Sequence, residues 1–269
     1  MKAVGGGIGG LILLIITLLL RGGDPGTIFN DNTNTGVNTP GSSYYEGTAP
    51  ISQEERELAD FVSIVLADTE DTWNEIFAAE NLDYREPTLV LFSGAVESAC
   101  GFAQAAVGPF YCPLDEKVYI DLSFYRDLRD SFGAPGDFAQ AYVIAHEIGH
   151  HVQNQLGIME EAQTARQQAS SQADASMLSV MLELQADCLS GVWAYNADRT
   201  REILEQGDIE EGLNAASAIG DDRLQMESQG QVTPDSFTHG SSAQRVSWFE
   251  RGLESGDINS CNTFEIMTP

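Results

Sequence analysis

One segment places metal-binding residues inside a helical pattern, and it restricts the possible folds more than any other part of the chain. We expect a largely buried helix from about residue 137 to residue 156, with Asp137 as its N-cap and Gly157 as its stop. A fold that contains this helix must bury it together with any polar side chains on its inner face. The apolar residues that recur at helical spacing are Phe138, Ala141, Tyr142, Ala145, Ile148, Val152 and Leu156.

The same helix carries the motif His-Glu-x-x-His. His146 and His150 are four residues apart, so they lie on one face of the helix, about one turn apart, and can bind one metal ion. Glu147 lies beside that ion and can take a proton from a water bound to it. Because unpaired polar groups are costly to bury, a metal explains these residues better than incidental histidines on an exposed helix. His151 points about 100° further round and is expected to be structural.

A third ligand must come from another part of the chain, because catalytic zinc usually takes three protein ligands and one water. Glu183 is the best candidate, since it lies in a second helical pattern from about residue 174 to residue 195. Asp187 follows one turn later on the same face. We expect its carboxylate to accept the free N–H of a ligand histidine, most simply His146. Without the preceding motif, two such carboxylates would be read as a solvated helix face.

Two further residues of the C-terminal part are candidates for the site. His239 is the last of four histidines. It could hydrogen-bond the tetrahedral intermediate, bind zinc in place of Glu183, or be structural. Arg245 could orient His239, pair with Asp187, or anchor the C-terminal segment. Tyr195 is expected to pack in the core rather than to donate to a substrate oxygen.

These residues together predict hydrolysis at a single Zn²⁺ ion, with Glu147 and His239 as the catalytic candidates. Zinc lowers the pKa of its water toward about 7, and Glu147 takes a proton and later passes it to the leaving amine. Glu147 should therefore affect the rate and hardly affect metal affinity. The alternatives are an extracytoplasmic binding domain that a metal stabilises without catalysis, and a zinc amidase acting on a non-peptide or cell-wall amide.

Several separated blocks of the sequence, besides the motif, carry a family resemblance. They are residues 67–73, 100–101, 108–113, 118–121, 136–139, 183–188, 220–225, 239–240 and 261–264. These blocks resemble the family of predicted neutral zinc metallopeptidases of bacterial membrane-anchored proteins, over roughly residues 54–264. The chain shows no departure from the family at the four site positions, which are His146, Glu147, His150 and Glu183.

The resemblance implies peptidase activity more strongly than any particular substrate. A looser similarity, to membrane endopeptidases of the CAAX prenyl type, supports a place for His239 and Arg245 near the site. It also implies a gluzincin-like zincin fold, which is α+β and mostly helical. In such a fold a small sheet packs on the motif helix, and an edge strand aligns the substrate in extended form.

The remaining segments give weaker local patterns. β-branched and aromatic residues predict strands over residues 88–92 and 117–122. Residues 99–103 are the candidate edge strand, and residues 108–113 a turn that shapes the cleft. The Gln-, Ala- and Ser-rich segment 159–172 is either a mobile flap over the cleft or an inert helix. Further helix is predicted over residues 54–77 and 199–225.

The N-terminal part predicts membrane attachment. An uncharged run of eighteen residues, without a clear A-x-A cleavage site, ends at Leu20. It predicts a signal-anchor transmembrane helix over residues 1–21, with a cleaved signal peptide as the alternative. Residues 22–52 are rich in Gly, Asn, Thr, Ser and Pro and predict a flexible linker. Residues 53–269 are then long enough for one zinc metallopeptidase domain.

The four cysteines bear on the compartment. They stand away from the predicted metal ligands, and an extracytoplasmic domain would oxidise them. Of three possible pairings we favour Cys100 with Cys112, which closes a loop beside the cleft. The second pair is then Cys188 with Cys261. Four buried thiols in a cytosolic domain are the alternative. The anchor and the disulfides together predict a single-pass protein of the cell membrane, with its catalytic domain periplasmic or extracellular.

The charge of the chain limits its partners. The sequence has 41 acidic and 13 basic residues, a formal net charge of -28. Such a field repels phosphates, so nucleic acid is not an expected partner. We interpret the charge as a solvated surface, and the alternative is attraction of cationic substrates. The expected partners are a protein or peptide substrate and the membrane.

Overall fold

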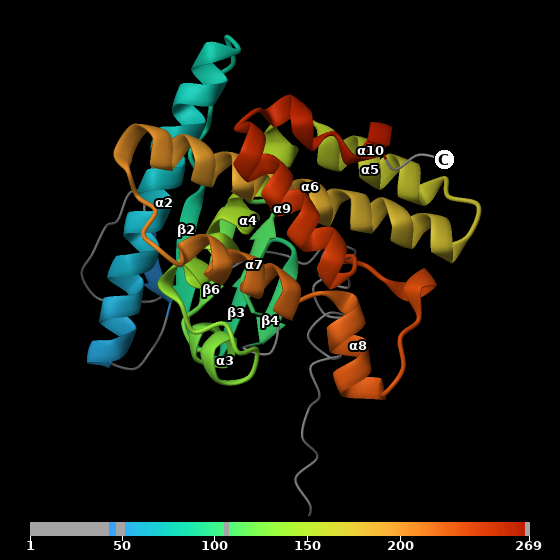
Figure 1. Cartoon of the computed structure of the whole chain (residues 1–269), viewed down its shortest axis with the longest axis horizontal. Helices are drawn as coiled ribbons and strands as arrows, with labels where there is room; N and C mark the ends of the chain where they lie inside the picture. The colour runs from blue at the N-terminus through green and yellow to red at the C-terminus, as the bar shows by residue number, and fades with distance from the viewer. Residues whose placement is uncertain (1–42, 47–51, 105–107, 267–269) are drawn as a thin grey trace, which may run out of the picture.

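A computed structural model describes residues 43–46, 52–104 and 108–266 (Figure 1). Its α-helices are α2 (Gln53–Ala79), α3 (Phe124–Asp130), α4 (Asp137–Gln155), α5 (Ile158–Gln167), α6 (Gln172–Arg201), α7 (Asp208–Ala218), α8 (Asp221–Gln229), α9 (Ser242–Ser255) and α10 (Thr263–Ile266). Its strands are β1 (Ser43–Glu46), β2 (Thr88–Phe92), β3 (Ala95–Ser98), β4 (Gly101–Gln104), β5 (Phe110–Cys112) and β6 (Lys117–Asp121). Two short 3-10 helices are η2 (Pro234–Ser236) and η3 (Ile258–Cys261). The predicted class, α+β and mostly helical with a small sheet, is confirmed.

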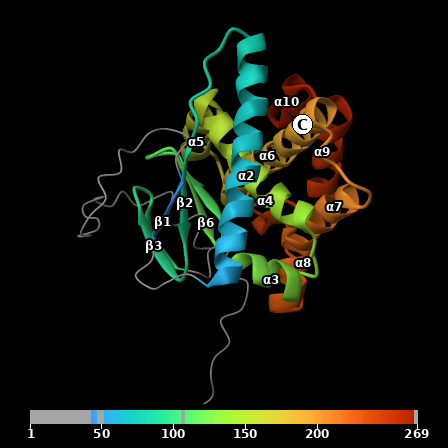
Figure 2. The same cartoon turned by 90° about the vertical axis from the view of Figure 1, so that its left-hand side faces the viewer.

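The main sheet has the strand order β1-β2-β6-β5. Its first three strands are parallel and β5 runs antiparallel to β6. Side chains of β2 alternate between two cores, as the period of a strand requires. Leu89 and Leu91 pack with the helices, whereas Val90 and Phe92 pack with the β3-β4 hairpin. Figure 2 shows the strands on one side of α2, with α4, α6, α7 and α9 on the other.

The motif helix α4 is the centre of the fold, since it packs against α2, α5, α6, α7 and β5. Its contact with α6 is close, because Gly149 has no side chain. A Cβ atom at Gly149 would lie 2.9 Å from the carbonyl oxygen of Ala186. A second close approach joins α6 to α9, where a Cβ at Gly252 would overlap the carbonyl oxygen of Cys188. Helix α6 is therefore held at a short distance from both α4 and α9.

The two ends of α4 differ in how well the sequence predicts them. The helix ends at Gln155 and Gly157 follows with a φ of 78°, so the predicted stop is confirmed. The predicted N-cap was wrong, because Gly136 takes this position and Asp137 is already helical. The Asp137 carboxylate instead accepts the N–H of the adjacent Phe138. A capping side chain must stand one residue earlier to reach the free N–H groups of the first turn.

Two other helical predictions need correction. Residues 199–225 do not form one helix, because Glu202 and Gly207 adopt left-handed backbone conformations, with φ values of 53° and 112°. These positions end α6 and begin α7, and α8 follows after Gly220. The segment 159–172, for which a flap and an inert helix were both open, is helical up to Gln167, as part of α5 (Ile158–Gln167).

The edge strand of the main sheet was predicted in the wrong segment. The last three residues of the segment 99–103 belong to β4 (Gly101–Gln104), which pairs with β3 in a separate two-stranded sheet. These two strands are joined by a tight turn, so they pair locally rather than with the main sheet. The edge strand that packs against α4 is β5. It lies in the segment 108–113, which was predicted as a turn.

Both disulfides that the sequence favours are formed. Cys100 and Cys112 join the hairpin turn to β5, with their Cα atoms 5.8 Å apart. Cys188 and Cys261 join α6 to η3, with their Cα atoms 5.5 Å apart. The first disulfide thus connects the two sheets at the edge strand, and the second connects the C-terminal segment to the helix of Glu183.

The N-terminal predictions fall largely outside the described residues. The predicted transmembrane helix over residues 1–21 lies outside them. Within the predicted linker 22–52, Ser43–Glu46 forms β1 and pairs with β2. In the part of the chain that the structure describes, no helix combines the length and the apolar character needed to cross a bilayer.

Candidate metal centre

Helices α4 and α6 bring the three predicted metal ligands together. The Nε2 atom of His146 lies 3.1 Å from Oε2 of Glu183, and Nε2 of His150 lies 3.6 Å from Oε1 of Glu183. One ligand atom from each of the three residues lies within 4.8 Å of the other two. Two imidazoles and one carboxylate are a donor set of catalytic zinc sites, which keep a fourth position for water. The residues therefore fit a zinc ion.

Asp187 orients the first of these histidines. Its carboxylate accepts a hydrogen bond from Nδ1 of His146 at 2.8 Å, so that Nε2 is the nitrogen that faces Glu183. Arg245 of α9 donates to both carboxylate oxygens of Asp187 at 2.8 Å, and the hydroxyl of Tyr142 donates to one of them. Of the three roles open for Arg245, the structure shows the pair with Asp187. The Asp187 side chain is fully buried.

Charge and burial act against each other in this cluster. Burial alone would lower the pKa of His146, but Asp187 and Glu183 outweigh it and raise this pKa to about 9. Burial would raise the pKa of Glu183, but the surrounding histidines hold it well below its usual value. The pKa of Asp187 is also held below its usual value against the effect of burial, chiefly by Arg245. Both carboxylates are thus ionised at neutral pH, which favours a cation between the helices.

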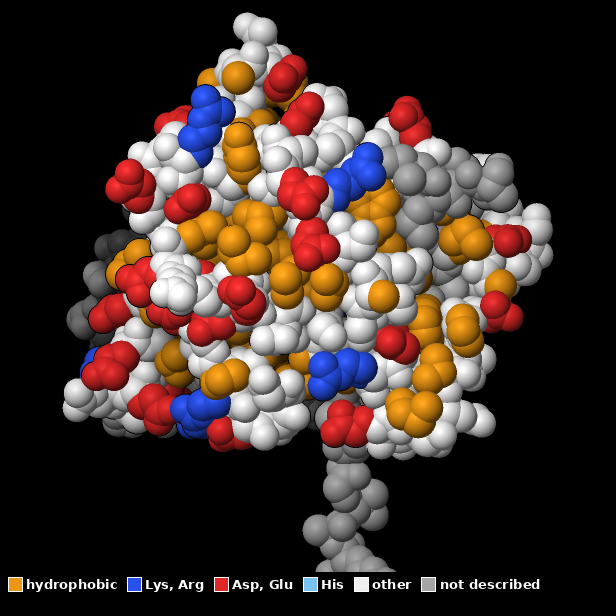
Figure 3. Space-filling view, in the orientation of Figure 1, with side chains coloured by type: hydrophobic (Ala, Val, Ile, Leu, Met, Phe, Trp, Pro, Cys, Tyr) orange, Lys and Arg blue, Asp and Glu red, His pale blue; other side chains and the backbone are white. Residues whose placement is uncertain are grey.

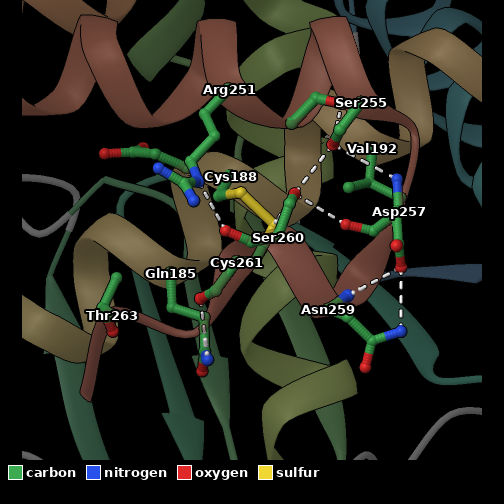
Figure 4. Close-up of a disulfide and its surroundings, with 12 residues drawn as sticks. Gln185, Cys188, Val192, Arg251, Ser255, Asp257, Asn259, Ser260, Cys261 and Thr263 are labelled. Atoms are coloured by element: carbon green, nitrogen blue, oxygen red, sulfur yellow. Dashed lines mark hydrogen bonds between the residues drawn. A yellow bond between two sulfur atoms is a disulfide. The ribbon is translucent and has the colours of Figure 1, made fainter. Parts of the chain in front are cut away.

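His150 is oriented through a chain of amides. Its Nδ1 donates to Oε1 of Gln153 at 2.8 Å, and Nε2 of Gln153 donates to Oε1 of Gln185 at 3.0 Å. Nε2 of Gln185 in turn donates to the carbonyl oxygen of Cys261 at 3.1 Å. Figure 4 shows Gln185 beside Cys261, next to the disulfide to Cys188. The C-terminal segment is therefore linked to a metal-ligand candidate through three hydrogen bonds.

Glu147 is buried on the same side of α4 and faces the edge strand. Burial raises the pKa of Glu147, while His146, His150 and a backbone hydrogen bond from Tyr111 of β5 lower it in part. A carboxylate with a raised pKa is a stronger base than a solvated one. Its place beside the ligand candidates is the one that a general base requires.

His239 approaches the centre from the C-terminal part. Its Nδ1 lies 3.3 Å from Oδ1 of Asp221. The other oxygen of Asp221 accepts the backbone N–H groups of Thr238, His239 and Gly240. His239 and Glu183 line one cavity. The negative charge of Glu183 raises the pKa of His239, although burial alone would lower it. The group of three convergent ligand atoms contains Glu183 and not His239.

A cavity of about 150 Å³ opens at the centre and is lined by Glu147, His146, His150 and Glu183. Most of its remaining surface is apolar. The apolar side chains that line it include Phe110, Phe124, Phe132, Val143, Ile219 and Leu224. A molecule bound in this cavity would touch the candidate metal-binding residues, the edge strand β5 and the apolar walls at once.

The remaining sequence candidates lie elsewhere. His151 is buried and bonds the carbonyl oxygen of Arg85 at 2.6 Å and the hydroxyl of Tyr111 at 3.0 Å. It therefore fixes β5 against α4, which is the structural role expected for it. Tyr195 packs against Gly256 at the C-terminal end of α9.

The sequence has relatives in several bacteria. Residues 1–264 match the protein family described as "Putative neutral zinc metallopeptidase". The chain belongs to this family. "Uncharacterized protein YpfJ" of Escherichia coli K12 is 53% identical over 258 residues, which are 96% of this chain and 87% of that protein. "Uncharacterized protein Rv2575" of Mycobacterium tuberculosis H37Rv is 46% identical over 191 residues, 67% of this chain and 63% of that protein. No solved structure matches the chain.

As a member of this zinc metallopeptidase family the chain is expected to bind zinc, and His146, His150 and Glu183 are the residues that would hold it. Three polar residues around them were missed by the sequence analysis. Tyr142 precedes His146 by one helical turn, so its position on the inner face was a usable signal. Gln153 likewise follows His150 on the same face. Asp221 has no such signal, because its distance from His239 depends on the loop between α8 and α9. The missed residues are Tyr142, Gln153 and Asp221.

Proposed function

We propose that the protein is a membrane-anchored zinc metalloendopeptidase with its catalytic domain outside the cytoplasm. One observation carries the catalytic part of this proposal. Two histidines of α4 and one glutamate of α6 converge on a cavity beside the buried carboxylate of Glu147. A structural zinc site would close with four protein ligands, whereas three leave room for water and substrate. This favours catalysis over a binding domain that a metal merely stabilises.

The roles of the side chains follow from their positions. His146, His150 and Glu183 would hold a zinc ion, which would supply Lewis acidity toward a water and a substrate carbonyl. Glu147 would act as the general base toward that water and as the proton donor to the leaving amine. His239 lies in the loop between η2 and α9, is held by Asp221 and lines the cavity. From there it would donate a hydrogen bond to the oxyanion. The Asp187 carboxylate keeps His146 in the tautomer that leaves Nε2 free for the metal.

The edge strand supports a peptide as substrate. β5 is the last strand of the sheet, and its Phe110 and Tyr111 line the cavity. An extended peptide can pair with the backbone of such a strand and present one of its bonds to the metal. A gluzincin-like zincin arrangement of sheet, motif helix and glutamate helix would serve this geometry.

Two features support the proposed compartment. The two disulfides are typical of proteins that fold in an oxidising environment. The apolar run before Arg21 is the expected membrane anchor. Protease protection of the chain in intact cells, compared with cells whose outer barrier has been opened, tests this orientation.

The test of the catalytic proposal is the Glu147→Gln variant. It should keep about one zinc ion per chain and lose about 100- to 10,000-fold of the rate of cleavage of an unstructured protein. Glu75→Gln, a change at an exposed glutamate of α2, is the matched control and should keep both properties. Retained activity in Glu147→Gln would exclude this residue as the base. Cleavage of a non-peptide amide, without any peptide in a substrate panel, would replace the endopeptidase by an amidase.

A further inference from the structure

Helix α5 presents one face to the cavity, and this face carries an arginine. Met159, Ala162 and Arg166 follow one another at helical spacing. Met159 and Arg166 line the cavity, and Ala162 is buried between them. α5 therefore forms a wall of the cavity rather than an inert connection between α4 and α6.

One donor of the Arg166 guanidinium has no partner within the described fold. Its Nε is buried and has no hydrogen-bond partner among the described residues. Arg245, another arginine of the cavity wall, differs in this respect because Asp187 binds it through both oxygens. Burial lowers the pKa of Arg166, and Glu183 compensates in part. Since Glu183 is engaged by His146 and His150, it is not available as a full partner. Buried donors in native proteins normally have a partner, so a ligand group is the natural one here.

The end of the cavity away from Arg166 is apolar. It runs along α4, because Val143, His146, Glu147 and His150 all line it at helical spacing. Figures 1 and 2 place α5 near one end of α4, and α3 and α8 near the other. The wall at the end of α3 and α8 is apolar, with Phe124, Phe132 and Leu224. A cationic end and an apolar end thus lie on opposite sides of the ligand candidates.

The exterior of the molecule has the opposite charge from Arg166. Figure 3 shows acidic side chains spread over the face that it displays. With a net charge of -28, the surface repels anions in general. A positive group inside the cavity therefore discriminates among substrates locally, where solvent screening is weakest.

We propose that Arg166 binds a carboxylate of the substrate, so that the protein prefers peptides with a carboxylate on one side of the cleaved bond and an apolar side chain on the other. The inference rests on the proposed peptidase function. A guanidinium matches a carboxylate with two parallel hydrogen bonds, which makes it selective over neutral amides. The carboxylate could be an Asp or Glu side chain or the free C-terminus of a peptide, and the experiment separates these sources.

The experiment uses the full 269-residue chain with zinc and fluorogenic peptides. One set carries Glu, Gln or Lys in turn at each position around an apolar residue, and the other compares a free with an amidated C-terminus. The original chain should cleave the best Glu peptide about tenfold faster than its Gln counterpart. Arg166→Gln should bring this ratio to about one, and Arg166→Glu should favour the Lys peptide. Arg199→Ala, at an exposed arginine of α6, is the control and should keep the ratio.

The two sources give different results. If a side chain is bound, the ratio follows the Glu-to-Gln exchange, and if the terminus is bound it follows amidation. The inference would be overturned if the wild-type protein cleaved Glu and Gln peptides, and free and amidated peptides, at nearly equal rates. It would also be overturned if a rate difference remained in Arg166→Gln.

A binding measurement separates this inference from the proposed function. In the Glu147→Gln background, fluorescence anisotropy reports peptide affinity without cleavage. Adding Arg166→Gln should weaken binding of the carboxylate peptide about tenfold and leave the amide peptide unchanged. If the original chain cleaves no peptide but this difference is found, the peptidase function fails and carboxylate binding stands. If cleavage occurs and the difference is absent, only the role of Arg166 is refuted.

Discussion

Replacing both Cys188 and Cys261 by alanine should destabilise the folded protein strongly. A disulfide acts mainly by restricting the unfolded chain, and the effect grows with the length of the loop that it closes. These cysteines are 73 positions apart, for which loop closure gives about 4.4 kcal/mol at room temperature. Cys100 and Cys112 are 12 positions apart, which gives about 2.8 kcal/mol. All four side chains are buried, so the cost of the cavities left by alanine is similar and largely cancels in the comparison.

Loss of the Cys188–Cys261 disulfide should also weaken zinc binding. The carbonyl oxygen of Cys261 accepts the amide of Gln185, and Gln185 holds Gln153 against His150. Without the disulfide the C-terminal segment can move away from α6, and this chain of hydrogen bonds loses its fixed end. Residues that orient a metal ligand typically contribute about 10- to 100-fold to affinity. We expect a loss near the lower value, because Gln153 and Gln185 themselves remain.

Urea unfolding in the presence of a chelator measures the stability of both alanine variants, and competition with a zinc indicator measures affinity. The variant without Cys188 and Cys261 should lose about 1.6 kcal/mol more than the one without Cys100 and Cys112. Equal losses, or the reverse order, would refute the loop-closure reasoning. An unchanged zinc affinity would refute the coupling through Gln185, whatever the stability.

Two further outcomes test the electrostatics. Burial, with Glu86 and Asp71 nearby, raises the pKa of Glu70 to about 7. The folded chain then keeps a proton at Glu70 that the unfolded chain has lost, so the free energy of unfolding should fall as pH rises from 4.5 to about 7. Glu70→Gln should therefore stabilise the protein by about 1.5 kcal/mol at pH 8, a value reduced to allow for the partial exposure of Glu70. At pH 4.5 the effect should be small. Urea unfolding at the two pH values measures both effects. Asp187→Asn should weaken zinc binding about 10- to 100-fold in the same competition assay, because His146 loses its charged partner.

Local patterns were sufficient for the central part of the site. The spacing of apolar residues predicts α4 and the burial of its inner face, and the same spacing places His146 and His150 together. The helix of Glu183 was predicted from the same kind of pattern, although its N-terminal end begins earlier and its C-terminal end extends to Arg201. The two cysteine pairs were favoured among only three possible pairings of four cysteines. In each case the signal lies within a few turns of one helix or in a small set of alternatives.

Features that depend on long-range pairing were not accessible in this way. β5 has only three residues, and its role as the edge strand depends on its pairing with β6 and on the disulfide to Cys100. The segment 99–103 has a comparable β propensity but pairs with its own neighbour, and no local pattern decides between the two. The place of Arg166 likewise depends on how α5 packs against the cavity, since its own sequence is typical of an exposed helix.

The Asp187 carboxylate is held by groups from two other helices, α4 and α9, and the last of these to be synthesised contains Arg245. Until that residue has left the ribosome, closing α4 on α6 would bury a charge without its counter-ion, which is strongly unfavourable. The geometry around His146 should therefore form only after Arg245 has been synthesised. For the peptidase proposed above, this order of assembly would keep the nascent polypeptide inactive until Arg245 has been synthesised.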